Sequence, residues 1–66
     1  MIVRVFRCWS GGDNFYWRLY LGDGRQYAFG EHEGGDGWNR HFASLALDLL
    51  VAETGKARRS IRFHVV

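Results

Sequence analysis

Apolar and polar residues alternate most regularly over residues 14–21. On one side of an extended chain lie Phe15, Trp17, Leu19 and Leu21, and the residues between them are polar or amphipathic. A period of two is typical of a strand with one buried face. We therefore expect a strand over residues 14–21 whose second face is open.

Two further extended runs flank this strand. Residues 2–9 are rich in β-branched and aromatic side chains, and residues 10–13 are typical of a loop. The segment Gly22-Asp23-Gly24 tolerates the backbone of a tight turn, and residues 25–29 then form a short third run. The three runs predict an antiparallel meander.

Residues 30–37 hold four glycines and three acids and predict a mobile loop. Asp36 is the expected N-cap of a helix over residues 38–54, and Gly55 is the expected stop. The apolar positions of this helix recur at spacings of three and four, with three more beside them: Trp38, Phe42, Leu45, Leu49 and Ala52, then Leu47, Leu50 and Val51.

A fourth strand is expected over residues 61–66, where Ile61, Phe63 and Val65 alternate with Arg62 and His64. A right-handed crossover would place this strand beside the first and parallel to it, in the spatial order 4-1-2-3. The sequence thus predicts one α+β domain over residues 1–66. Its element order is β-β-β-α-β, a four-stranded, mainly antiparallel sheet with one helix packed on one face.

One helix covers only one face of a sheet, so the alternate strand positions are expected to point away from it. They form an aromatic and basic set without acids: Arg4, Tyr16, Arg18, Tyr20, Arg62 and His64, with Ile2 and Phe6 beside them. Such a face suits stacked bases and phosphates, or an acidic protein surface, or simply solvated strand positions in which aromatic pairs support the sheet.

Charge, cysteine content and hydropathy indicate the cellular compartment in which we expect the protein. The net charge of +2 is mild, with acids concentrated in residues 13–36 and cations in residues 37–66. Cys8 is the only cysteine, so an internal disulfide is excluded and a reducing compartment is expected. No apolar run has the length of a membrane span, and we expect a cytoplasmic protein without a membrane partner.

The spacing of the histidines, acids, serines and Cys8 gives little support for a catalytic or metal site. Glu31, His32 and Glu33 are consecutive, and His41 has no second histidine four residues away. No serine, nor Cys8, has a recognisable histidine and acid partner, so we expect no catalytic residue, metal or cofactor. The acidic run Glu31, Glu33 and Asp36 is a second candidate surface, because carboxylates on a loop can occupy a basic groove.

Three resemblances accompany these patterns. From residue 15 to about residue 50, the run Phe15-Tyr16-Trp17-Arg18-Leu19, the turn at Gly22-Asp23-Gly24 and the Ala/Leu-rich helix resemble YegP-like small domains. That family's usual Gly-Tyr-Ser/Thr entry to the helix is absent, and the resemblance implies little chemistry. The strand-strand-strand-helix order is also similar to plant AP2-type DNA-binding domains, in which Arg18 and Arg25 would be the analogous residues.

In size and in the lack of a site motif, the chain resembles phage-encoded inhibitors of bacterial defence, including anti-CRISPR proteins. This resemblance implies a protein partner. We therefore expect a non-enzymatic protein-binding module, of the phage-inhibitor type, that blocks a host protein or complex. The alternative is a nucleic-acid-binding domain that uses the same sheet face, and a homodimer through that face is a further possibility.

Overall fold

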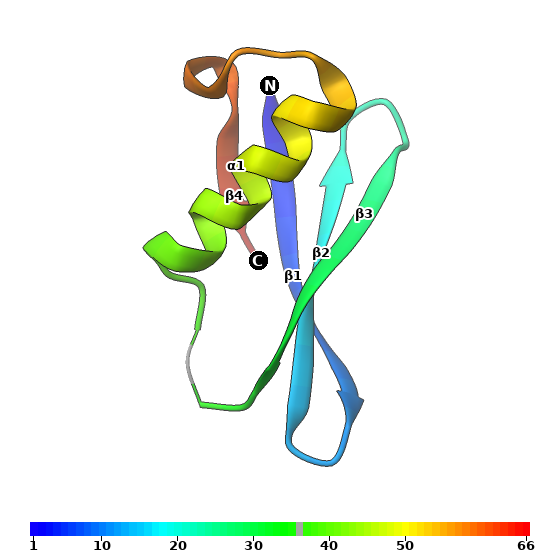
Figure 1. Ribbon diagram of the computed structural model, residues 1–66. Helices are drawn as coiled ribbons and strands as arrows, with labels where there is room; N and C mark the ends of the chain where they lie inside the picture. Colours follow the sequence, from blue (N-terminus) through cyan, green and yellow to red (C-terminus); the bar gives the residue numbers. More distant parts are fainter. Residues whose placement is uncertain (36) are drawn as a thin grey trace.

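The computed structural model of the protein describes residues 1–35 and 37–66, which form a four-stranded sheet with one helix on one face (Figure 1). The elements are β1 (Ile2–Gly11), β2 (Asn14–Leu21), β3 (Gln26–Glu33), α1 (Arg40–Thr54), the 3-10 turn η1 (Arg58–Ser60) and β4 (Arg62–Val65). The strand order is β3-β2-β1-β4. Strands β1, β2 and β3 are antiparallel, and β4 runs parallel to β1. The predicted fold class and strand order are confirmed.

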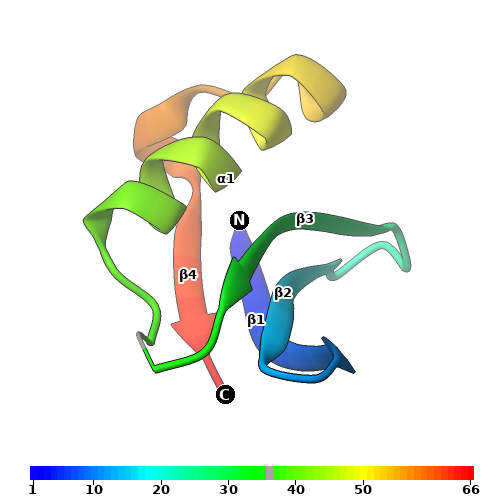
Figure 2. The same cartoon turned by 60° about the horizontal axis from the view of Figure 1, so that its bottom comes forward.

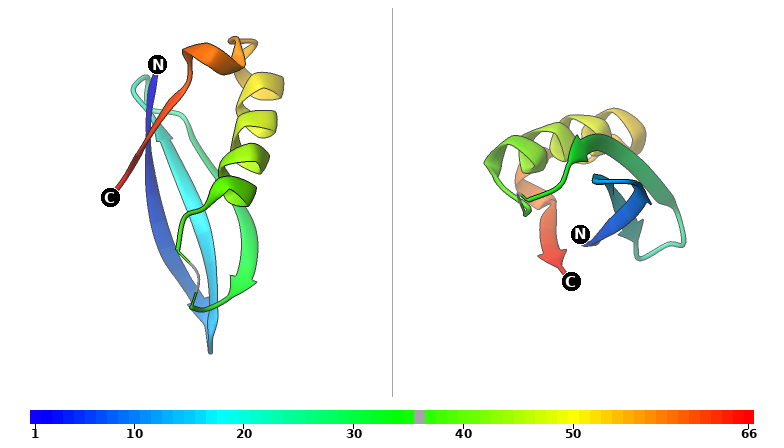
Figure 3. Two further views of the ribbon diagram at one scale, coloured as in Figure 1. Left: turned by 90° about the vertical axis from the view of Figure 1, so that its left-hand side faces the viewer. Right: turned by 90° about the horizontal axis from the view of Figure 1, so that it is seen from below.

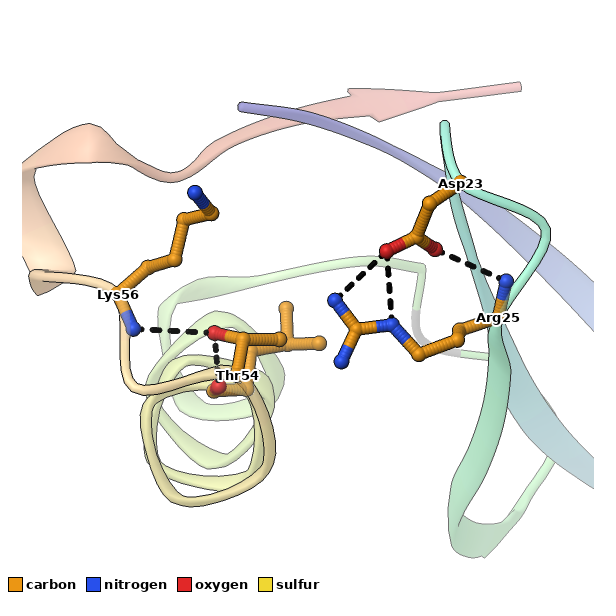
Figure 4. A network of polar contacts seen from close by, with 5 residues as sticks. Asp23, Arg25, Thr54 and Lys56 are labelled. Carbon is orange, nitrogen blue, oxygen red and sulfur yellow. Dashed lines mark hydrogen bonds and ion pairs between the residues drawn. The ribbon is translucent and has the colours of Figure 1, made fainter.

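The turn between β2 and β3 is stabilised by its own aspartate. Asp23 Oδ1 accepts a hydrogen bond from the Arg25 backbone N–H at 3.0 Å, and Oδ2 accepts one from the Arg25 side chain at 2.8 Å (Figure 4). The hydrogen bond from the guanidinium lowers the pKa of Asp23. The Leu21 N–H then donates to the Arg25 carbonyl at 2.9 Å, which closes the turn.

Strand β3 is longer than the sequence predicts, because residues 30–33 belong to the sheet and not to a loop. The register with β2 slips between Trp17, opposite Phe29, and Phe15, opposite His32, so β3 carries an extra residue there. Gly30 lies at this bulge with φ 71°, a backbone conformation that glycine adopts without steric cost. The glycine that suggested a loop therefore bends the strand without ending it.

Helix α1 begins two residues later than expected. The side chain of Asn39 caps it by accepting a hydrogen bond from the Phe42 N–H at 3.1 Å, whereas the expected cap, Asp36, lies outside the described residues. Gly55 ends the helix with φ 72°, as predicted. In the last turn the Thr54 hydroxyl donates to the Leu50 carbonyl and accepts from the Lys56 N–H (Figure 4).

The helix faces the sheet in a different phase from the one predicted. Its buried residues are Phe42, Ala46 and Leu50, whereas Leu45 is 41% exposed and Ala52 is also exposed. Both apolar series share Phe42 and a helical spacing, so the sequence pattern does not separate them. The structure selects the series with Ala46 at its centre, and Ala46 and Leu50 are fully buried against the sheet side of the helix.

The core lies between α1 and the part of the sheet formed by the start of β1 and the end of β2. Its members are Val3, Val5, Trp17, Leu19, Leu21, Phe42, Ala46, Leu50 and Ile61. Figures 2 and 3 show the helix on one side of the sheet only, with the β1–β2 turn and the end of β3 projecting beyond the helix. The other face of the sheet carries no element among the described residues.

Candidate functional site

The uncovered face of the sheet, called the open face below, follows directly from the buried positions. Because side chains alternate along a strand, the neighbours of Val3, Val5, Trp17 and Leu19 point away from the helix. The open face comprises Ile2, Arg4, Phe6, Cys8, Tyr16, Arg18, Tyr20, Gln26, Ala28, Arg62 and His64. All six strand residues that the sequence assigned to a binding face lie in this set.

Arg4 lies at the centre of the open face. The register places Tyr20 beside it on β2 and His64 beside it on β4, and Gln26 extends the row onto β3. Four neighbouring strands set about 4.8 Å apart make a row about 14 Å wide. Arg4 is exposed, and none of the described carboxylates pairs with it. The row therefore presents a cation flanked by a ring and an imidazole.

Arg18 is held in place by its neighbours. Its guanidinium donates to the Tyr16 hydroxyl at 2.8 Å and to Gln26 Oε1 at 3.1 Å. The hydrogen bond to Tyr16 raises the pKa of Arg18 above its usual value. The sequence analysis did not identify Gln26 as part of the binding face. The alternation of side chains along β3, which places Gln26 on the same side as Ala28, is the signal that could have identified it. These contacts restrict the rotamers of Arg18 before any partner arrives.

A second aromatic pair stiffens the surface beside Arg4. Phe6 and Tyr20 meet edge to face, with ring centroids 5.2 Å apart and an interplanar angle of 82°. Both rings are half-buried. At the other end of the open face, Arg62 donates to the Arg59 carbonyl at 2.9 Å and lies opposite the exposed Ile2. The open face is thus a partly ordered mixture of rings and cations.

Two of the three acids of the predicted acidic loop lie in a strand. Glu31 and Glu33 belong to β3, and Asp36 lies outside the described residues. Glu31 points to the same side as the open face and accepts a hydrogen bond from the Ser10 hydroxyl at 3.4 Å. The expectation of a sheet face without acids is therefore wrong at its far end, beside the β1–β2 turn. Along the strands the face changes from basic to acidic.

The remaining acid and histidine lie elsewhere. Glu33 lines a shallow hollow with Asp13, Phe15, Gly34 and Gly35 at the end of the hairpin. His32 points toward the helix side, stacked on Trp17 with centroids 5.5 Å apart and 4.7 Å from Phe42. Its Nδ1 lies 3.1 Å from the Glu33 carbonyl oxygen. The consecutive Glu31, His32 and Glu33 are therefore split between two faces of the sheet.

Searches of protein-family models, of curated proteins and of solved structures found no match. Among residues 1–35 and 37–66, no three His, Cys, Asp or Glu side chains are grouped as metal ligands would be. Within the same residues, α1 is too short and too polar to cross a lipid bilayer. The resemblances noted in the sequence stay predictions.

Proposed function

We propose that the protein is a small binding module whose open face docks onto an acidic surface of a partner protein. The observation that carries this proposal is the continuous row of Gln26, Tyr20, Arg4 and His64 across all four strands. Tyrosine and arginine are the residue types that most often dominate the energy of protein interfaces. A partner carboxylate placed over Arg4 would meet a cation that no described carboxylate satisfies.

Pre-organisation supports a binding role over a purely structural one. If the rings only stabilised the sheet, their cross-strand contacts would suffice and the cations beside them would be free to vary in position. Arg18 is instead restrained by two hydrogen bonds, from strands β2 and β3. Restraint before binding lowers the entropy lost when a partner is bound. Blocking of a host protein or complex, as the sequence suggested, is the form of binding that such a module would perform.

Nucleic acid is the second candidate, because the same face combines rings with Arg4, Arg18 and Arg62. Single-stranded nucleic acid is bound by stacking on aromatic side chains and by cations along its backbone. The half-buried state of Phe6, Tyr16 and Tyr20 argues against this candidate, since a stacked base needs an accessible ring face. The acidic end at Glu31 would also repel a phosphate backbone that followed the strands.

The test is affinity capture with matched charge variants. The wild-type protein, Arg4→Glu and Tyr20→Ala are each immobilised, with Arg40→Glu as a control that makes the same charge change on α1, on the other side of the sheet. Proteins retained by the wild type and by Arg40→Glu, but lost with both open-face variants, support the proposal. For each such protein, calorimetry should show that Tyr20→Ala raises Kd by roughly 30-fold if the ring is central.

A titration separates the two candidates. Labelled duplex DNA, single-stranded DNA and RNA are added at about 50 and 200 mM salt, the range over which phosphate contacts lose most affinity. Binding that falls steeply with salt, with a smaller slope for Arg62→Ala, would replace the protein partner by nucleic acid. Captured proteins that bind the wild type and all three variants equally would exclude the open face as the site.

A further inference from the structure

The lower half of β1 has a free backbone edge. Strand β4 pairs only with residues 2–5 of β1, and its last contact is the hydrogen bond from the Val66 N–H to the Val5 carbonyl at 3.0 Å. Beyond that point, no described residue pairs with this side of β1, as Figures 1 and 3 show. Backbone groups of odd-numbered residues face β4, so those of Arg7 and Trp9 face the free edge.

Two side chains on this free edge, those of Arg7 and Trp9, are available to a partner. Trp9 is 67% exposed, although its indole N–H is fixed by a hydrogen bond to the Gly12 carbonyl at 2.8 Å. Arg7 points to the same face of the sheet, and its guanidinium lies 3.9 Å from the Phe15 ring centroid. A guanidinium has two faces, and Phe15 covers only one. The edge thus offers an exposed ring platform and an arginine face two residues away.

We propose that two copies of the chain pair through this edge, β1 against β1, antiparallel and centred on Cys8. In that register Arg7 of one copy lies directly opposite Trp9 of the other, so each guanidinium gains a second aromatic face. Arg7 and Trp9 then exchange backbone hydrogen bonds, and the two Cys8 residues form the non-hydrogen-bonded pair between them.

The neighbouring registers are less favourable. Centring the pair on Arg7 would place the two like charges directly opposite each other, which destabilises a sheet. Centring it on Trp9 would draw the bulge between Trp9 and Gly11 into the middle of the paired stretch. The Cys8 register pairs residues 7–9 of the two copies beyond the end of β4. Val66, whose N–H donates to the Val5 carbonyl, lies beside Phe6 and must turn aside where Ser10 of the second copy approaches. The short paired stretch implies a weak dimer that leaves the open face uncovered.

Disulfide trapping tests the register. The two Cys8 Cα atoms would be about 4.5 Å apart, within the range of about 4.4–6.8 Å that a disulfide spans. Diamide, which takes up the two electrons and two protons, should convert the wild type to a covalent dimer. In the control Cys8→Ser/Ser10→Cys, the two thiols would lie about 13 Å apart, and no rapid trapping is expected.

Sedimentation equilibrium supplies the second measurement. Trp9→Ala should raise Kd of the dimer at least about tenfold, because both cation–π pairs are lost. Ile2→Ala, an equally exposed apolar position of β1 outside the free edge, should leave Kd unchanged. A protein that is monomeric at its highest soluble concentration overturns the proposal. Equal trapping of both cysteine positions, or weakening by Ile2→Ala instead of Trp9→Ala, overturns it too.

Discussion

At the scale of single residues, Gly34 and Gly37, which follow β3, differ in how closely other atoms pack around them. A Cβ added at Gly34 would lie 2.9 Å from Phe15 Cε2 and 3.2 Å from the Asp13 carbonyl oxygen. The Gly34 N–H also donates to that carbonyl at 2.7 Å. Gly34 is therefore required where β3 passes close to the β1–β2 turn. A Cβ at Gly37 meets nothing within 4 Å, so packing does not require a glycine at this position.

We therefore predict that Gly34→Ala lowers the free energy of unfolding by about 1–3 kcal/mol, as overpacked substitutions do. The Phe15 ring must move, and the backbone oxygen of Asp13 has little freedom to follow. The matched control Gly37→Ala should change stability by less than about 1 kcal/mol, in either direction. Urea denaturation of both variants measures the difference, and equal effects would contradict the packing at Gly34.

At the scale of elements, α1 combines a well-defined start with a mixed apolar pattern. Asn39 supplies the capping oxygen, and the first turn holds no acidic residue that would interact with the helix dipole. The Asn39 cap is therefore the main local interaction that favours a helix start at Arg40. Thr54 and Gly55 define the other end. Between these ends, only contact with the sheet determines which apolar side chains are buried.

Replacing Asn39 should show how much the cap contributes. Asn39→Ala removes the oxygen that accepts from the Phe42 N–H and should cost about 1 kcal/mol of stability. Asn39→Asp keeps a capping oxygen and should restore most of the loss. Thermal unfolding followed by circular dichroism measures both variants. A stable Asn39→Ala protein would mean that another residue satisfies the first turn.

At the scale of the whole molecule, the last strand joins the two ends of the chain. The Arg62 N–H donates to the Met1 carbonyl at 2.8 Å, and β4 then runs along the first half of β1. Ile61, only 4% exposed, fills the core between β4 and α1. Because β4 has four residues and one neighbouring strand, its attachment depends on this anchor. The end of β4 limits the extent of the open face and marks where the free edge of β1 begins.

Ile61→Ala should accordingly destabilise the protein by about 2–4 kcal/mol, through lost burial and the cavity left behind. Val65→Ala, in the same short strand but 46% exposed, is the matched control and should cost well under half as much. Chemical denaturation quantifies both. Hydrogen exchange of the Val3 and Val5 amides should rise in Ile61→Ala if β4 detaches before the rest of the sheet unfolds.

The sequence by itself determined the four strands, the helix and the division of β2 into a buried and an open side, because these depend on local period and turn chemistry. The strand order was predicted from the preferred handedness of the crossover, and the structure decided it. Tertiary structure decided the rest. The bulge at Gly30 depends on pairing with β2, and it moved Glu31 into the sheet. The helix phase depends on which of the apolar side chains of α1 are buried against the sheet. The free edge of β1 depends on where β4 stops beside it. Periodicity within one segment carries no information about how far a neighbouring segment extends.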